Sequence, residues 1–169
     1  MAKCMNCGKS GAFLRVGPTG YCRACENWTN VVRKNFYESP LLKTHYDNLQ
    51  KIDQTYKLAN SLEDPFNPHM DLCLKLCMQD ISIAKQFRDL CITYKQPVPN
   101  YGSFKRAAII YDKRKMYKEA IDVCTQSIIL GYTDNNDMYS RLARLLKKSG
   151  GVSLERHLLQ FGINTNDIK

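Results

Sequence analysis

The chain has 169 residues, of which 44% are hydrophobic; this is enough to build the core of an ordinary domain and excludes a disordered tail. No segment approaches the ~20 apolar residues that a membrane span needs. The beginning of the chain lacks the apolar segment of a secretory signal, so we expect a protein of the reducing cytoplasm. The formal net charge of +9 favours anionic partners, either a phosphate backbone or an acidic protein surface.

Four of the eight cysteines form two CxxC pairs near the start of the chain. Cys4, Cys7, Cys22 and Cys25 have a spacing that is typical of zinc sites, because each pair directs two thiolates at one tetrahedral ion. A disulfide framework or a redox dithiol fits this spacing less well. We therefore predict one structural Zn²⁺ ion with four sulfur ligands and no open position for catalysis.

The segment between the two pairs predicts a β-hairpin, with a strand over 11–16, a Gly-Pro turn and a return strand. Phe13 and Leu14 would then flank the metal. After the second pair, apolar residues recur at steps of three and four, so a helix is expected to begin at the last two ligands. This arrangement resembles the treble-clef zinc finger, with the zinc ribbon as the alternative, and we assign residues 1–38 to it.

Residues 39–169 predict a second, helical domain, because their apolar residues recur at helical steps and no stretch alternates like a strand. Ser39-Pro40 and Asn67-Pro68 each combine a capping residue with proline at the first helical position. The predicted fold class is mainly α: a small zinc finger with a short β-hairpin and a helix, followed by an antiparallel helix-pair stack. Helices are expected over 39–62, 68–79, 81–95, 102–114, 117–131, 136–149 and 153–161.

One pattern of small and bulky residues recurs within the helical domain. Ala108 and Ala120 are small where two antiparallel helices would cross. The positions that follow the pattern are Phe104, Ala107, Ala108, Tyr111, Ala120, Cys124 and Ser127, and then Met138, Leu142, Leu145, Leu154, Leu158 and Phe161. The pattern resembles the tetratricopeptide repeat (TPR), an α-solenoid of helix pairs, over 101–134, and in shortened form over 135–161. The match over 67–100 is weaker, and an unrelated stack of helical hairpins is the alternative.

The cysteine and histidine residues outside the two CxxC pairs are more typical of core positions than of a metal or catalytic site. His69, Cys73 and Cys77 are spaced by four residues, so a second metal site is the alternative to core packing, which their apolar neighbours favour. Cys91 and Cys124 lie on apolar stripes. A Ser-His-Asp order, a phosphate-binding glycine loop and an HExxH motif are all absent from the sequence, and no base can be named for cysteine chemistry. We expect a protein without enzymatic activity.

The TPR resemblance implies a groove lined by the first helix of each pair. On this chain those positions are Asp71, Lys75, Lys105, Ile109, Asp112, Tyr139 and Ala143. Basic residues cluster between Lys105 and Lys118 and would place positive potential at one end of the groove. The leading hypothesis is therefore a non-enzymatic adaptor that binds a protein or peptide with acidic residues around an apolar anchor.

The alternative hypothesis is a regulator that binds nucleic acid through the zinc finger and the basic cluster. Lys3, Lys9, Arg15 and Arg23 surround the cysteine pairs and carry this alternative. Salt separates the two hypotheses, because contacts with phosphates make binding fall steeply with ionic strength.

Overall fold

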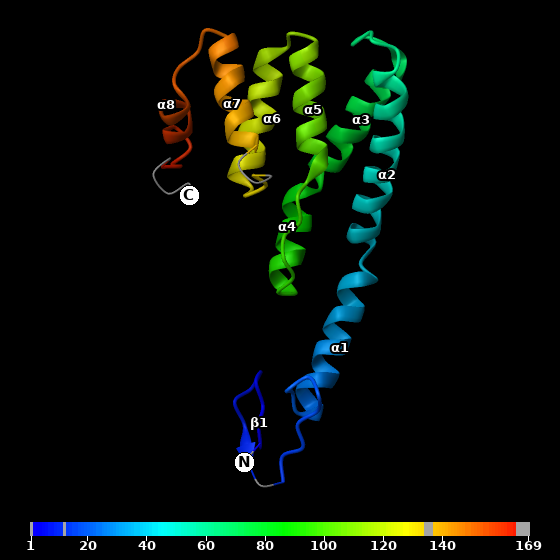
Figure 1. Cartoon of the computed structure of the whole chain (residues 1–169), viewed down its shortest axis with the longest axis vertical. Helices are drawn as coiled ribbons and strands as arrows, with labels where there is room; N and C mark the ends of the chain where they lie inside the picture. The colour runs from blue at the N-terminus through cyan, green and yellow to red at the C-terminus, as the bar shows by residue number, and fades with distance from the viewer. Residues whose placement is uncertain (1, 12, 134–136, 165–169) are drawn as a thin grey trace. The chain divides into compact units, whose positions relative to one another are not determined.

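The chain divides into two compact units, unit 1 (Met1–Lys43) and unit 2 (Thr44–Lys169), which we describe separately. A computed structural model describes residues 2–11, 13–133 and 137–164 (Figure 1). The predicted mainly helical class with a short N-terminal hairpin is confirmed. Of the helices in the described residues, none has the length and apolar character needed to cross a membrane.

Unit 1 begins with a two-stranded hairpin that encloses the first cysteine pair. Strands β1 (Ala2–Lys3) and β2 (Ser10–Gly11) are antiparallel, with Ala2 opposite Gly11. The predicted position of the hairpin, between the two pairs, is therefore wrong. In that segment the structure has a turn at Gly17–Gly20 and an isolated bridge from Val16 to Cys22. Phe13 is fully exposed instead of flanking the cysteines.

Helix α1 (Arg23–Tyr37) follows the second pair directly, as expected. Its more enclosed side is the stripe of Cys25, Thr29, Val32 and Phe36, spaced at three and four residues. Phe36 is the buried residue of the helix. This stripe is thus the less exposed side of α1, and the positions opposite it face solvent.

Helices α2 (Pro40–Asn60) and α3 (Pro68–Ser82) form an antiparallel pair. The side chain of Asn67 accepts a hydrogen bond from the Met70 amide at 2.9 Å, which caps α3 where Pro68 begins it. Residues later in α2 contact residues earlier in α3, as expected for antiparallel helices. His45 meets Asp80, the Ile52 carbonyl meets Cys73, and the Ala59 carbonyl meets Asn67.

Helix α4 (Ala84–Thr93) continues from α3 rather than folding back on it. The two helices are separated by Ile83 alone, whose backbone stays in the right-handed helical region (φ −99°, ψ −2°). One residue in that conformation bends a helix without reversing it, and Figure 1 shows α4 leading on from α3. The weaker match over 67–100 is therefore not a helix pair, because α3 takes α2 as its antiparallel partner.

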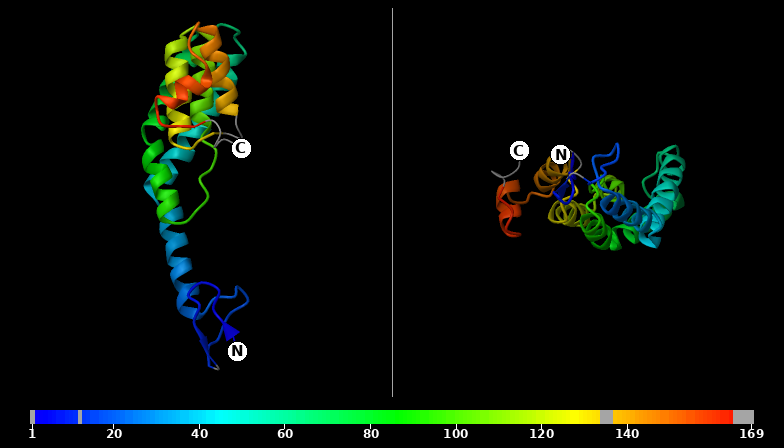
Figure 2. Two further views of the ribbon diagram at one scale, coloured as in Figure 1. Left: turned by 90° about the vertical axis from the view of Figure 1, so that its left-hand side faces the viewer. Right: turned by 90° about the horizontal axis from the view of Figure 1, so that it is seen from below.

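The second half of unit 2 contains α5 (Gly102–Lys113), α6 (Tyr117–Ile129), α7 (Asp137–Lys148) and α8 (Leu154–Leu159). Helix α5 packs on α3 and α6, and α7 packs on α6 and α8. The helices succeed one another from cyan α2 to red α8 (Figure 2). Residue 136, where the penultimate helix was expected to begin, lies outside the described residues.

The core of unit 2 includes an aromatic cluster. The rings of Tyr101 and Tyr132 lie 4.7 Å apart, and Phe87 and Phe104 lie within 6 Å of Tyr101. The Tyr132 hydroxyl donates to the Ala84 carbonyl at 2.9 Å, so this tyrosine joins α4 to the end of α6. The four cysteines predicted in the core are fully buried there: Cys73, Cys77, Cys91 and Cys124.

Candidate metal centre and binding surfaces

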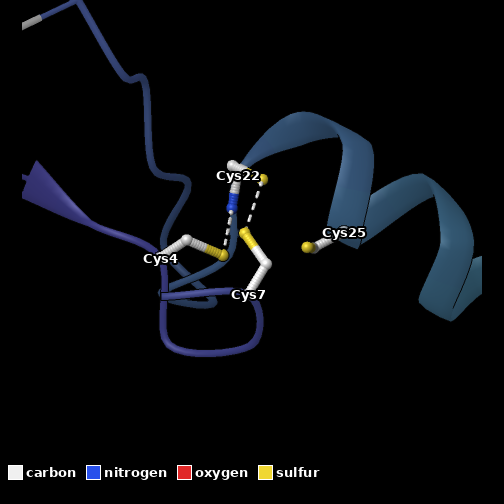
Figure 3. Close-up of side chains that lie close together, drawn as sticks. All are labelled: Cys4, Cys7, Cys22 and Cys25. Atoms are coloured by element: carbon white, nitrogen blue, oxygen red, sulfur yellow. Dashed lines mark hydrogen bonds between the residues drawn. The ribbon is translucent and has the colours of Figure 1, made fainter. Parts of the chain in front are cut away.

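The four cysteines of unit 1 converge on one point (Figure 3). Their sulfur atoms all lie within 4.8 Å of one another, and those of Cys7 and Cys22 are 3.9 Å apart. A disulfide would require about 2.05 Å. A tetrahedral ion with bonds of about 2.3 Å needs sulfur atoms roughly 3.8 Å apart. The observed separation therefore suits a shared cation.

The backbone around the first pair forms the tight turn that such a site needs. The amide of Gly8 donates to the Cys4 carbonyl at 3.0 Å, and the amide of Cys4 donates to the Lys9 carbonyl at 2.9 Å. Gly8 has φ +71°, a left-handed conformation that residues with a side chain adopt rarely. Cys7 is thus brought back beside Cys4.

The start of α1 supplies the second pair. Cys22 is the residue before the first helical turn, and Cys25 lies within that turn. The Cys22 amide donates to the Cys4 sulfur at 3.3 Å, which links the two pairs through backbone rather than side chains alone. The helix end therefore sets the position of two ligands at once.

The thiols differ in acidity. Backbone amides of Cys7 and Cys22 donate to the Cys4 sulfur and lower the pKa of this thiol to about 6. The side chain of Asn6 acts in the same direction at Cys25. Burial and the neighbouring thiols outweigh it and raise the pKa of Cys25 to about 12. Four thiols this close cannot all ionise without a cation among them, and a bound cation would replace their protons.

The ligand set determines what such a site can do. Four sulfur donors fill a tetrahedron and leave no position for water or substrate. Across the described parts of the chain, this is the one cluster of His, Cys, Asp or Glu able to hold a metal ion. Cys73 instead points its sulfur at the Ile52 carbonyl at 3.7 Å, and His69 is exposed. The second metal site considered for His69, Cys73 and Cys77 is not formed.

The predicted partner-binding residues lie on three helices. Asp71 and Lys75 are on α3, which is the second helix of its pair; Lys105, Ile109 and Asp112 are on α5, and Tyr139 and Ala143 are on α7. Several of them already form ion pairs with oppositely charged side chains. Lys105 pairs with Asp137 at 3.1 Å, Asp112 with Lys148 at 2.6 Å, and Asp71 with Arg114 at 2.7 Å.

A groove of about 370 Å³ lies between α2 and α5. Leu49 and Ile52 form its apolar wall, and Lys105 and Arg106 line its opposite side. The Arg106 guanidinium lies 4.3 Å from the centre of the Tyr56 ring, which covers it from α2. Sequence reasoning missed the α2 side of this groove, although the buried positions 45, 52 and 59 repeat every seven residues and mark that helix as paired.

A buried polar cluster joins α2, α3 and α5 and was also missed. The Asp80 carboxylate, fully buried, accepts from His45 Nδ1 at 3.1 Å, from Asn48 at 3.3 Å and from the Ser103 hydroxyl. His45 stacks on Tyr101, and its Nε2 has no partner. Because Ser103 donates to Asp80 and not to His45, the cluster lacks the nucleophile–base contact of a catalytic triad.

Comparison with known proteins gives no further guide. No protein-family profile matches the chain, and neither curated proteins nor solved structures gave a match.

Proposed function

We propose that the protein is a non-enzymatic adaptor, in which a zinc-bound finger accompanies a TPR-like helical unit that binds another protein. The observation that carries the proposal is the set of parallel helices α2, α5 and α7 with the groove between the first two. A scaffold that exposes neighbouring parallel helices offers a continuous surface for an extended or helical peptide.

The direction of these helices follows from ion pairs and hydrogen bonds between them. Arg106 contacts Asp53 and Lys113 contacts Asn60, so α5 and α2 advance together. Lys105 contacts Asp137 and Lys148 contacts Asp112, so α7 runs the same way. This is the relation that the first helices of successive helix pairs have in a solenoid.

The side chains on this surface suit a partner with an apolar anchor. Leu49, Ile109, Tyr139 and Ala143 are half-buried, so each retains surface that a partner can cover. Lys105 and Arg106 are themselves partly exposed. Exposed ion pairs contribute only about 0–1 kcal/mol, so carboxylates of an acidic partner can exchange with Asp137 and Asp53 at little cost.

Zinc is the metal that we assign to the four cysteines. It prefers tetrahedral thiolate sites, and four cysteines are a common structural set. The role we propose for it is to hold unit 1 together.

A quantitative pull-down from the native host tests the adaptor proposal. The bait is the whole protein, and the variant is Lys105→Glu with Tyr139→Ala. We expect this variant to lose a partner that the unmodified protein retains. Lys9→Glu with Arg15→Glu, the control variant on unit 1, should retain the same partner. Circular dichroism shows whether each bait is folded. A partner lost with the unit 1 variant and kept by the groove variant would contradict the proposal.

A further inference from the structure

Unit 1 carries a surface with a strong excess of positive charge. Its acids are Glu26 and Glu38, whereas its basic side chains, all exposed, are Lys3, Lys9, Arg15, Arg23, Arg33, Lys34 and Lys43. Among the described residues, the one ion pair of these basic side chains joins Lys34 to Glu38 at 3.9 Å, and both members are mostly exposed. By contrast, the basic side chains along the groove of unit 2 form ion pairs with carboxylates.

Part of this positive charge lies along the solvent-exposed side of α1. Arg23, Asn27, Asn30 and Lys34 are all exposed and are spaced by four, three and four residues, so they form one stripe along the helix. The stripe lies opposite the less exposed side of the helix, which holds Cys25 and Phe36. We call these four residues the α1 stripe.

The acids beside the α1 stripe leave it positive. Glu26 is half-buried and accepts a hydrogen bond from the Thr19 hydroxyl at 3.3 Å, which engages it with the loop before the helix. Glu38 lies beyond the end of the helix. An exposed pair such as Lys34–Glu38 contributes too little to prevent Lys34 from taking another anion.

From this surface we infer that the α1 stripe binds duplex DNA, with α1 lying in the major groove. The stripe is about 16 Å long, and a helix fits the groove width of about 12 Å. Arginine and lysine contact phosphates and guanine edges, and asparagine contacts adenine through two hydrogen bonds. The charge of unit 1 supplies the complementary field. This function is separate from the proposed adaptor role of unit 2.

Fluorescence anisotropy of the whole zinc-loaded protein tests the inference. The probe is a labelled mixed-sequence duplex of about 20 base pairs, which accommodates one such helix with flanking contacts. We expect Arg23→Glu with Lys34→Glu to weaken binding by more than about tenfold and to reduce the salt slope by about two. Asn27→Ala with Asn30→Ala should lower the preference among duplex sequences and leave the salt slope unchanged.

The matched control is Lys57→Glu with Lys147→Glu, which makes the same charge change at exposed positions of unit 2 outside the basic cluster. We expect it to change duplex affinity by less than about threefold, because long-range charge effects are screened by salt. Zinc content identifies variants whose unit 1 has not folded, and Arg23→Gln with Lys34→Gln then replaces the charge reversal. Equal losses in stripe and control variants, or tighter binding of the corresponding single strand, would overturn the inference. Neither outcome bears on the groove of unit 2.

Discussion

The two units of the chain differ in the types of side chain that they bury. In unit 1 the buried side chains of the described residues are Cys4, Cys22, Phe36 and Leu42, so sulfur makes up much of its interior. Unit 2 buries large apolar side chains from every helix, with Phe87 and Phe104 fully enclosed. A small hairpin with so little apolar surface needs a covalent or metal link to fold, whereas the helices of unit 2 have a core of their own. The comparison predicts that unit 1 depends on metal and unit 2 does not.

The largest expected effect comes from removing one metal ligand. Cys22→Ser should abolish metal binding and unfold unit 1, because three thiolates and a hydroxyl hold zinc far less well. Most of the helical circular dichroism should remain. Hydrogen exchange followed by mass spectrometry should show fast exchange confined to unit 1. Cys124→Ala, in the core of unit 2, is the control and should leave the metal content unchanged. Loss of protection in both units with Cys22→Ser would break the comparison.

The next effect concerns the buried carboxylate of unit 2. Asp80→Ala should lower the free energy of unfolding by about 3–5 kcal/mol, because His45, Asn48 and Ser103 lose their common acceptor. Urea denaturation measures this. Asp89→Ala removes an exposed pair with Lys85 and should cost less than about 1 kcal/mol. Similar losses in the two variants would show that the cluster is not a stabilising element.

A smaller effect is expected where helices α5 and α6 cross. Ala108 and Ala120 are fully buried, so Ala108→Leu or Ala120→Leu should overpack the contact and cost about 1–3 kcal/mol. Gln126→Leu, at an exposed position of α6, should change stability by no more than about 0.5 kcal/mol. If thermal unfolding of either alanine variant matched that of the parent, the packing of α5 on α6 would be wrong.

The smallest effect is a dependence on pH. Burial opposes ionisation of Asp137, but the hydrogen bond from Lys105 and the charge of Arg141 hold the pKa of this carboxyl below its ordinary value. A lowered pKa in the folded state means that Asp137 stabilises unit 2 above its unfolded pKa of about 3.9 and loses this contribution as the pH falls through the folded value. Asp137→Asn should therefore melt slightly below the parent at neutral pH. The two melting temperatures should converge once the pH has fallen below this folded value, and a constant difference would argue against this assignment.

Helix positions could be predicted from the sequence because their signals are local. Pro68 after Asn67 fixes the start of α3, and the glycine and proline breaks separate the later helices. The pairing of α3 could not be predicted in this way, since periodicity shows that a face is buried but not what covers it. Nothing in the segment around Ile83 marks a bend instead of a reversal, so the sequence left open whether α3 and α4 pair with each other.

The candidate sites differ in the same way: those with a local sequence signal could be predicted, and those that depend on distant residues could not. The four cysteines could be found because their chemistry and spacing are specific, whereas strands of two residues leave no pattern, so the hairpin was placed wrongly. His45 carried no signal, because its hydrogen-bond partner Asp80 lies 35 positions away in the chain, and Ser103, which donates to the same carboxylate, lies 58 positions away. The groove was only half predicted, since its α2 wall depends on the pairing that the sequence concealed.

Metal analysis of the whole protein, purified without chelator, tests the central claim most directly. We predict one zinc ion per chain by elemental analysis and native mass spectrometry, lost together with the amide protection of unit 1 when a chelator is added, while unit 2 keeps its protection. A stoichiometry near zero with unit 1 still protected from exchange would contradict the account, because the four cysteines would then have no part in holding that unit together.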